Sequence, residues 1–207
     1  MSVVGAFVGI FVAIFYEPVL GGKLELEYGF NSDQVAYFYS ILTIATFTSN
    51  LYLTVFPIKR NLLFWITVST VGEIISILLM GPSRLLQLPD SLITMGIGNG
   101  LLGLICQVYG VAMVLITLEP LQKRFPGQNH RISKLFGAYR QISIGFGFFF
   151  SPFYASSVTS LSSYETTCDS VALLLLLFLA VFLGVHLSQR EKKEEAFEKS
   201  LKEPLIA

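Results

Sequence analysis

Long runs of apolar residues alternate along the chain with short polar and charged segments. Runs without any Asp, Glu, Lys or Arg cover residues 2–16, 34–58, 61–72, 91–118, 141–164 and 170–189. Glu73 interrupts an apolar run that continues to Met80. A helix needs about 20 predominantly apolar residues to cross the hydrocarbon core of a bilayer. The pattern therefore predicts six transmembrane helices, at residues 3–20, 33–56, 62–80, 92–118, 135–156 and 171–187.

The composition favours a membrane protein over a soluble one. Of the 207 residues, 53% are hydrophobic and 14% are charged, whereas a soluble domain carries roughly 25% charged residues. Six apolar runs with hardly any polar face cannot all be buried inside a soluble protein of this length. The formal net charge is zero and no basic stripe is present, so a nucleic-acid partner is not expected. We therefore expect an all-α polytopic protein surrounded by a lipid bilayer.

The lysines and arginines collect on one side of the predicted helices. Only Lys23 and Arg84 fall on the other side. The basic side carries Lys59, Arg60, Lys123, Arg124, Arg131, Lys134, Arg140, Arg190, Lys192, Lys193, Lys199 and Lys202. Because short cytoplasmic loops are rich in Lys and Arg, this side is predicted to be cytoplasmic, together with both termini. Residues 1–188 are thus interpreted as a transmembrane domain and residues 189–207 as a charged cytoplasmic tail.

Three carboxylates lie within the predicted spans. An ionisable group at bilayer depth costs about 3 kcal/mol and usually marks a pathway or a paired interior site. Glu17, near the outer end of the first span, is the leading candidate for a functional carboxylate. Glu73 lies mid-span and fits either an interior polar contact or a functional carboxylate. Glu119 lies near the inner end of its span, where the two basic residues that follow favour an interfacial role.

Neutral polar side chains at the same depth can hydrogen-bond a solute or bridge two helices. For each of these residues taken singly, a bridge between two helices is the expected role. They are Asn50, Asn99, Gln107, Tyr109, Tyr139 and Gln141. Glycines give the fourth span a smooth face that a neighbouring helix or a substrate can approach closely, and most such faces are packing faces. They are Gly96, Gly98, Gly100 and Gly103.

No catalytic constellation is visible in the sequence. The chain has no G-x-S-x-G elbow, no phosphate-binding glycine loop and no His, Cys and Asp cluster with metal-ligand spacing. His130 lies in a predicted loop and His186 at the edge of the last span. Cys106 and Cys168 are too few and too badly placed for a disulfide framework. We therefore expect neither an enzyme nor a bound metal or cofactor.

Several short motifs resemble those of the carboxy-terminal half of a major facilitator superfamily transporter, most closely in the vesicular amine and polyamine transporter branch. Residues 16–20 (YEPVL) are similar to the branch's acid-Pro-Thr-Leu signature, with Val19 in place of threonine. Residues 79–82 (LMGP) and 88–92 (LPDSL) are similar to its stretch at the outer end of helix nine. Residues 147–152 (GFFFSP) resemble its helix-eleven G-x-x-x-G-P element, with Ser151 in place of the second glycine.

The resemblance implies six helices arranged as a 3+3 inverted repeat, which is half of the complete fold. Gln107 and Gln141 stand where amine transporters of this family have carboxylates. The residues expected to bind the substrate and protons are Glu17, Tyr16, Gln107, Tyr109 and Gln141. Further candidates are Glu73, Asn50, Asn99 and Tyr139.

The resulting hypothesis is secondary active transport of a small organic solute, a cation by resemblance, through alternating access. Glu17 would exchange the charge of the solute for a proton. Because one half encloses no complete cavity, a second six-helix half or a second copy of the chain is expected as partner. The competing hypothesis is a membrane component that does not transport, either an assembly partner or a truncated, inactive half. The expected location is the plasma membrane or an endosomal or vesicular membrane.

Overall fold

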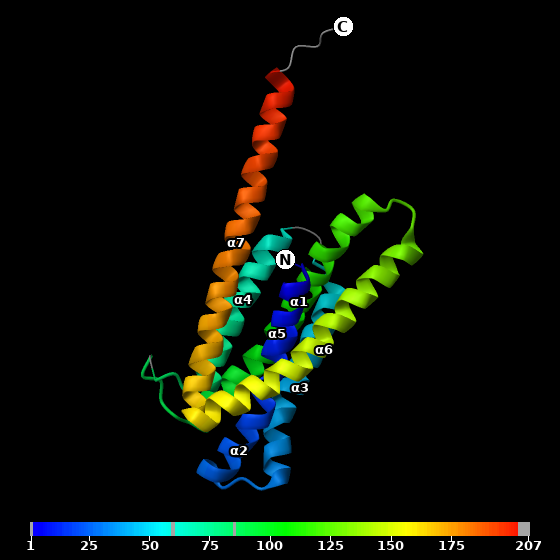
Figure 1. The fold of residues 1–207 in the computed structure, drawn as a ribbon. Helices are drawn as coiled ribbons and strands as arrows, with labels where there is room; N and C mark the ends of the chain where they lie inside the picture. The colour runs from blue at the N-terminus through cyan, green and yellow to red at the C-terminus, as the bar shows by residue number, and fades with distance from the viewer. Residues whose placement is uncertain (1, 59–60, 85, 203–207) are drawn as a thin grey trace.

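All regular secondary structure in the computed structural model is helical, within the residues that it describes, 2–58, 61–84 and 86–202. Side chains are described for residues 4–188 within these ranges. The helices form a single bundle (Figure 1). They are α1 (Ser2–Ile14), α2 (Glu17–Tyr28), α3 (Ser32–Val55), α4 (Leu62–Met80), α5 (Leu92–Arg124), α6 (Asn129–Leu161) and α7 (Tyr164–Lys202).

Local signals account for several of the helix ends. At the start of α3, Asn31 and Gln34 form a capping box, because each side chain accepts a hydrogen bond of 2.9 Å from the other's backbone N–H. Ser91 caps α5 by accepting a hydrogen bond of 3.2 Å from the backbone N–H of Thr94. Gly29 ends α2 in the left-handed conformation, with φ of 67°.

The first predicted span, residues 3–20, is wrong as a single helix. α1 ends at Ile14, and α2 begins at Glu17 and continues to Tyr28. Pro18 has no N–H to give the Ile14 carbonyl, so the hydrogen-bond ladder of α1 cannot continue and a new helix begins. Lys23, which the sequence predicts in a connecting segment, lies within α2 and is 4% exposed.

The other five predicted segments are all helical. α4 has the predicted bounds, and α3 is displaced by one residue at each end. α5, α6 and α7 extend beyond their predicted segments because polar residues continue the same helices past the apolar runs. α7 passes position 188 without a break, so the backbone of the predicted tail continues the last helix to Lys202. Residues 203–207, the end of that tail, lie outside the described residues.

Within the described residues, four helical segments are long and apolar enough to cross a membrane. They are Val4–Tyr28, which includes α1 and α2, Leu62–Met80, Leu92–Arg124 and Tyr164–Ser188. α3 and α6 are 24 and 33 residues long, but polar side chains lower the hydropathy of both, and glycines lower that of α6 as well. Four of the six predicted spans therefore meet the requirements of a membrane helix by length and composition.

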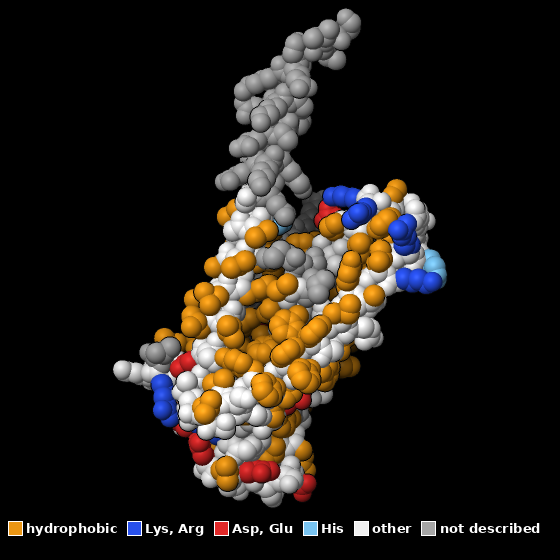
Figure 2. Space-filling model, viewed as in Figure 1, with side chains coloured by type: hydrophobic (Ala, Val, Ile, Leu, Met, Phe, Trp, Pro, Cys, Tyr) orange, Lys and Arg blue, Asp and Glu red, His pale blue; other side chains and the backbone are white. Residues whose placement is uncertain are grey.

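The helix connections separate into two ends of the bundle. The α2–α3, α4–α5 and α6–α7 connections lie at one end, and the α5–α6 connection and the distal part of α7 lie toward the other (Figure 1). Lys and Arg side chains gather around the α5–α6 connection, and Asp and Glu side chains gather near α2 (Figure 2). The predicted basic pair Lys59 and Arg60, and the side chains of the basic residues from 190 onward, lie outside the described residues.

α5 packs against both α3 and α4, and two glycines allow the close approach. A Cβ atom at Gly98 would lie 2.5 Å from the backbone N of Met80 and 2.7 Å from the carbonyl O of Ser76, both on α4. A Cβ atom at Gly103 would lie 2.6 Å from the carbonyl O of Leu42 on α3. These contacts confirm the packing role predicted for the glycine face, since the glycines let backbones meet without intervening side chains.

The Gly98→Ala variant tests this close packing. The added methyl group would meet the backbone of α4, which cannot move aside as a side chain can, so we expect a loss of stability of about 2 kcal/mol. Gly100→Ala, two residues further along the same helix, is the matched control because its nearest atom would be the Ile41 side chain at 3.4 Å. Thermal unfolding in detergent measures both. Equal midpoints for the two variants would contradict the assigned contact.

Candidate functional site

A cavity of about 420 Å³ lies between α1, α5 and α6. Most of its lining is apolar, with side chains such as Ile10, Met113 and Phe136. Polar or titratable side chains also reach it: Cys106, Gln107, Tyr109, Thr117, Tyr139, Arg140 and Ser143. A mainly apolar cavity of this size with a few polar groups suits a small organic molecule, because the apolar wall buries the molecule and the polar groups orient it.

Tyr109 connects two walls of this cavity. It is 1% exposed, and its hydroxyl donates a hydrogen bond of 2.8 Å to the carbonyl O of Gly5 on α1. A Cβ atom at Gly9 would lie 2.7 Å from the Tyr109 ring, so the ring fits against α1 only because that position is a glycine. The tyrosine thereby fixes the distance between α1 and α5 on one side of the cavity.

The structure brings three of the predicted site residues together. Gln107, Tyr109 and Tyr139 line the cavity. Tyr16 does not, because it is buried at the start of α2, with its ring 6.2 Å from that of Tyr39. Glu17 is exposed in the first turn of α2, and its backbone carbonyl accepts a hydrogen bond of 2.8 Å from the Tyr39 hydroxyl.

The remaining candidates lie elsewhere in the bundle. Gln141 on α6 and Asn50 on α3 are exposed and do not line the cavity. Asn99 is buried and bridges two helices, because its amide donates a hydrogen bond of 3.0 Å to the carbonyl O of Phe38. Glu73 is fully buried on α4. Glu119 is exposed and pairs with Lys123 at 2.6 Å, which agrees with the neighbour expected from the sequence.

Sequence reasoning missed two features of the site. Arg140 lines the cavity, although the sequence pattern indicated only a charge on the basic side of the helices. Its position directly after Tyr139, within the predicted span 135–156, is the available signal. Lys23 was also counted as a loop charge, although Glu27 follows one helical turn later. A lysine paired at that spacing within an apolar stretch is a sign of a helical ion pair.

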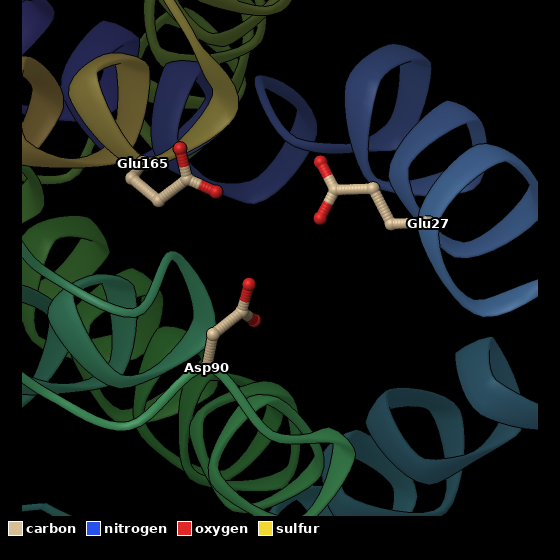
Figure 3. A group of neighbouring side chains, drawn as sticks. All are labelled: Glu27, Asp90 and Glu165. Carbon is tan, nitrogen blue, oxygen red and sulfur yellow. The ribbon is translucent and has the colours of Figure 1, made fainter.

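Three carboxylates converge on the Lys23 ammonium at the end of the bundle. They come from Glu27 on α2, Asp90 just before α5 and Glu165 on α7, and they point toward one another (Figure 3). The Lys23 Nζ lies 3.0 Å from a Glu27 carboxylate oxygen and 3.1 Å from one of Asp90, and it also pairs with Glu165. We call these four residues the Lys23 cluster.

Further contacts complete the Lys23 cluster. An Arg84 guanidinium nitrogen lies 3.2 Å from the second oxygen of Glu165. The Tyr28 hydroxyl donates a hydrogen bond of 2.6 Å to Asp90. Although three carboxylates at this spacing could hold a metal ion, the Lys23 ammonium already supplies the positive charge between them. The cluster is therefore a structural ion-pair network that connects α2, the α4–α5 connection and α7.

Comparisons with family models, with curated proteins and with solved structures found no match to the chain. The fold defines a broad class, a helical protein whose described part contains four segments long and apolar enough to cross a membrane. A more specific function has to be argued from the cavity and from the buried side chains around it.

The Lys23→Met variant tests the structural role of the Lys23 cluster. Removing the ammonium leaves three carboxylates without their shared partner, and losing one member of a buried ion pair costs about 3 kcal/mol. Lys123→Met is the matched control, because this lysine also pairs with a glutamate one turn away but is exposed, so less than about 1 kcal/mol is expected. Thermal unfolding in detergent compares them. Added Ca²⁺ should leave the native midpoint unchanged, and a clear rise would contradict the assignment.

Proposed function

We propose that the chain is one half of a secondary transporter that moves a small organic solute through the cavity between α1, α5 and α6. The observation that carries this proposal is the cavity itself, about 420 Å³ in volume and mostly apolar. It is bounded by helices that include segments apolar enough to cross a membrane. In alternating access, such a cavity opens to one side and then to the other as helix groups tilt around a fixed site.

We infer that α3 and α6 cross the bilayer as well, which gives six spans. Both are longer than the roughly 20 residues that a span requires. Their exposed polar side chains, such as Asn50 and Gln141, would be costly against lipid. A second six-helix half or a second copy of the chain would cover them. Since short cytoplasmic loops are rich in Lys and Arg, the end with the α5–α6 connection would face the cytoplasm, with both termini.

The proposal includes the resemblance to the carboxy-terminal half of a major facilitator superfamily transporter, with its 3+3 inverted repeat. One of the motifs falls at a helix break and another at a helix contact, so both have a structural role. The YEPVL motif contains the break between α1 and α2. In the GFFFSP motif, a Cβ atom at Gly147 would overlap Ile10, and the Ser151 hydroxyl donates a hydrogen bond of 2.7 Å to the Phe11 carbonyl O.

The proposed charge of the solute follows from the resemblance alone. The amine branch implies a cation. Among the described residues, the lining of the cavity contains no carboxylate, and its charged side chain is Arg140. The proposal therefore requires a carboxylate outside this lining to balance the charge of the cation.

A second candidate function is assembly without transport. The exposed positions of Glu17 and Gln141 favour it, because neither side chain lines the cavity. A chain of this kind would stabilise a partner in the membrane and would not move a solute itself. Blocking the cavity distinguishes the two candidates, since only a transporter requires the space.

The Gly110→Phe variant tests the transport function. Gly110 lines the cavity and has open space where a Cβ would lie, so a phenyl ring would fill the cavity without disturbing the helices. Gly184→Phe is the matched control, because this position on α7 is also open and is not among the cavity residues. We expect uptake of organic cations by vesicles from cells that express the chain to fall at least about tenfold for Gly110→Phe alone. Equal uptake for both variants would exclude transport through this cavity.

The proposed orientation predicts which exposed positions a membrane-impermeant maleimide can reach. Asn129→Cys lies at the start of α6 and Glu25→Cys on α2, at opposite ends of the bundle, and both side chains are exposed. Because the α6 end carries the basic residues, Asn129→Cys should react only from the cytoplasmic side and Glu25→Cys only from the other side. Labelling of intact cells and of inverted vesicles measures this. The reverse pattern would overturn the orientation.

A further inference from the structure

The two ends of the bundle differ in how their charges are compensated. At the end with the Lys23 cluster, Lys23 and Arg84 both have carboxylate partners. At the other end lies the α5–α6 connection, and Glu119 is the only acidic residue between residues 91 and 164. The same stretch contains five basic residues, which are Lys123, Arg124, Arg131, Lys134 and Arg140. This stretch therefore has an excess of positive charge.

The bundle does not neutralise this excess itself. Glu119 pairs with Lys123 at 2.6 Å. In the part of the chain that the structure describes, Arg124, Arg131 and Lys134 form no ion pair. All three side chains are exposed, and basic side chains gather at this end of the surface (Figure 2). Because like charges repel one another, an anion from outside the chain would stabilise the group.

Two of these arginines lie against one aromatic ring. The guanidinium carbon of Arg131 is 4.3 Å from the centroid of the Phe125 ring, and that of Arg124 is 5.7 Å from it. A tight turn holds them there, because the backbone N–H of Gln128 donates a hydrogen bond of 3.2 Å to the Phe125 carbonyl O and Gly127 has φ of 75°. Neighbouring guanidinium groups present planar sets of N–H donors, a geometry that suits the oxygens of a phosphate group.

The length of α5 places this pair at the membrane surface. The uncharged part of the helix, residues 92–118, is about 40 Å long at 1.5 Å per residue. A bilayer with its headgroup regions has about the same thickness, roughly 40–45 Å. The last turn of α5, which ends at Arg124, and the connection that follows it therefore lie level with the lipid headgroups.

We propose that Arg124 and Arg131 form a binding site for the phosphate group of an anionic membrane lipid, and that Lys134 adds to its attraction. A lipid fits this place better than a soluble anion, because its acyl chains lie in the bilayer beside the helices and keep its headgroup at the level of the arginines. The site requires only that the chain is embedded in a membrane. It is therefore independent of transport through the cavity and applies equally to a chain that only assembles with a partner.

The experiment adds phosphatidylglycerol, or phosphatidylcholine with the same acyl chains, to the purified full chain in a non-ionic detergent. Native mass spectrometry counts the lipids bound. We expect the native chain to bind one phosphatidylglycerol about tenfold more tightly than phosphatidylcholine, with an affinity that falls as salt is added. Arg124→Gln and Arg131→Gln should each weaken phosphatidylglycerol binding about fivefold and leave phosphatidylcholine binding unchanged.

Arg84→Gln is the matched control. It also removes the charge of an exposed arginine, but at the other end of the bundle, where Glu165 is the partner of this residue. Binding of phosphatidylglycerol should therefore stay as in the native chain. Unchanged thermal midpoints of the three variants establish that they are folded.

Three results would overturn the proposal. Equal affinities for the two lipids would show that the headgroup is not recognised. An equal loss of phosphatidylglycerol binding in Arg84→Gln would show that binding follows the total charge of the chain and not this site. Complete displacement of the lipid by an equal concentration of inorganic phosphate would assign the arginines to a soluble anion. None of these results depends on whether the chain transports a solute.

Discussion

The ammonium of Lys23 holds together parts of the chain that are far apart in sequence. Its three carboxylate partners belong to α2, to the α4–α5 connection and to α7, so a single buried charge fixes the end of the bundle at which these elements meet. A buried charge is stable only when its partners stay in place. Glu73, further along the bundle, is the opposite case, because its carboxyl group is just as buried but has no hydrogen-bond partner among the described residues.

Between these two sites, small residues determine how closely the helices approach. Gly98 and Gly103 bring α5 against α4 and α3, and Gly9 accommodates the Tyr109 ring against α1. The same helix thus packs without space on two sides and borders a cavity on a third.

The helices could be predicted from the sequence because apolar run length alone decides where a span can lie, as the bounds of α4 illustrate. The break at Pro18 was also encoded locally, by a missing N–H, although the apolar run concealed it. The cavity could be predicted only in part. Gln107, Tyr109 and Tyr139 do line it, but a helix exposes several faces, and only tertiary packing decides which one turns inward. Gln141 lies only two residues from Tyr139 on α6 and does not reach the cavity. Burial of Lys23 depended on carboxylates from distant segments, which no local pattern reveals.

The partners of the Lys23 cluster are also synthesised one after another, so the ion pairs form in a fixed order during translation. Glu27 is synthesised almost together with the lysine, but Asp90 and Glu165 follow 67 and 142 residues later. A ribosome that adds about 5–20 residues per second delivers the last carboxylate on the order of ten seconds after the lysine. During that interval the ammonium has only part of its compensation, and the end of α2 has no α7 to hold it. A ribosome that stalls before residue 165 would therefore leave a nascent chain with an incompletely neutralised charge, which quality-control factors in the membrane could recognise.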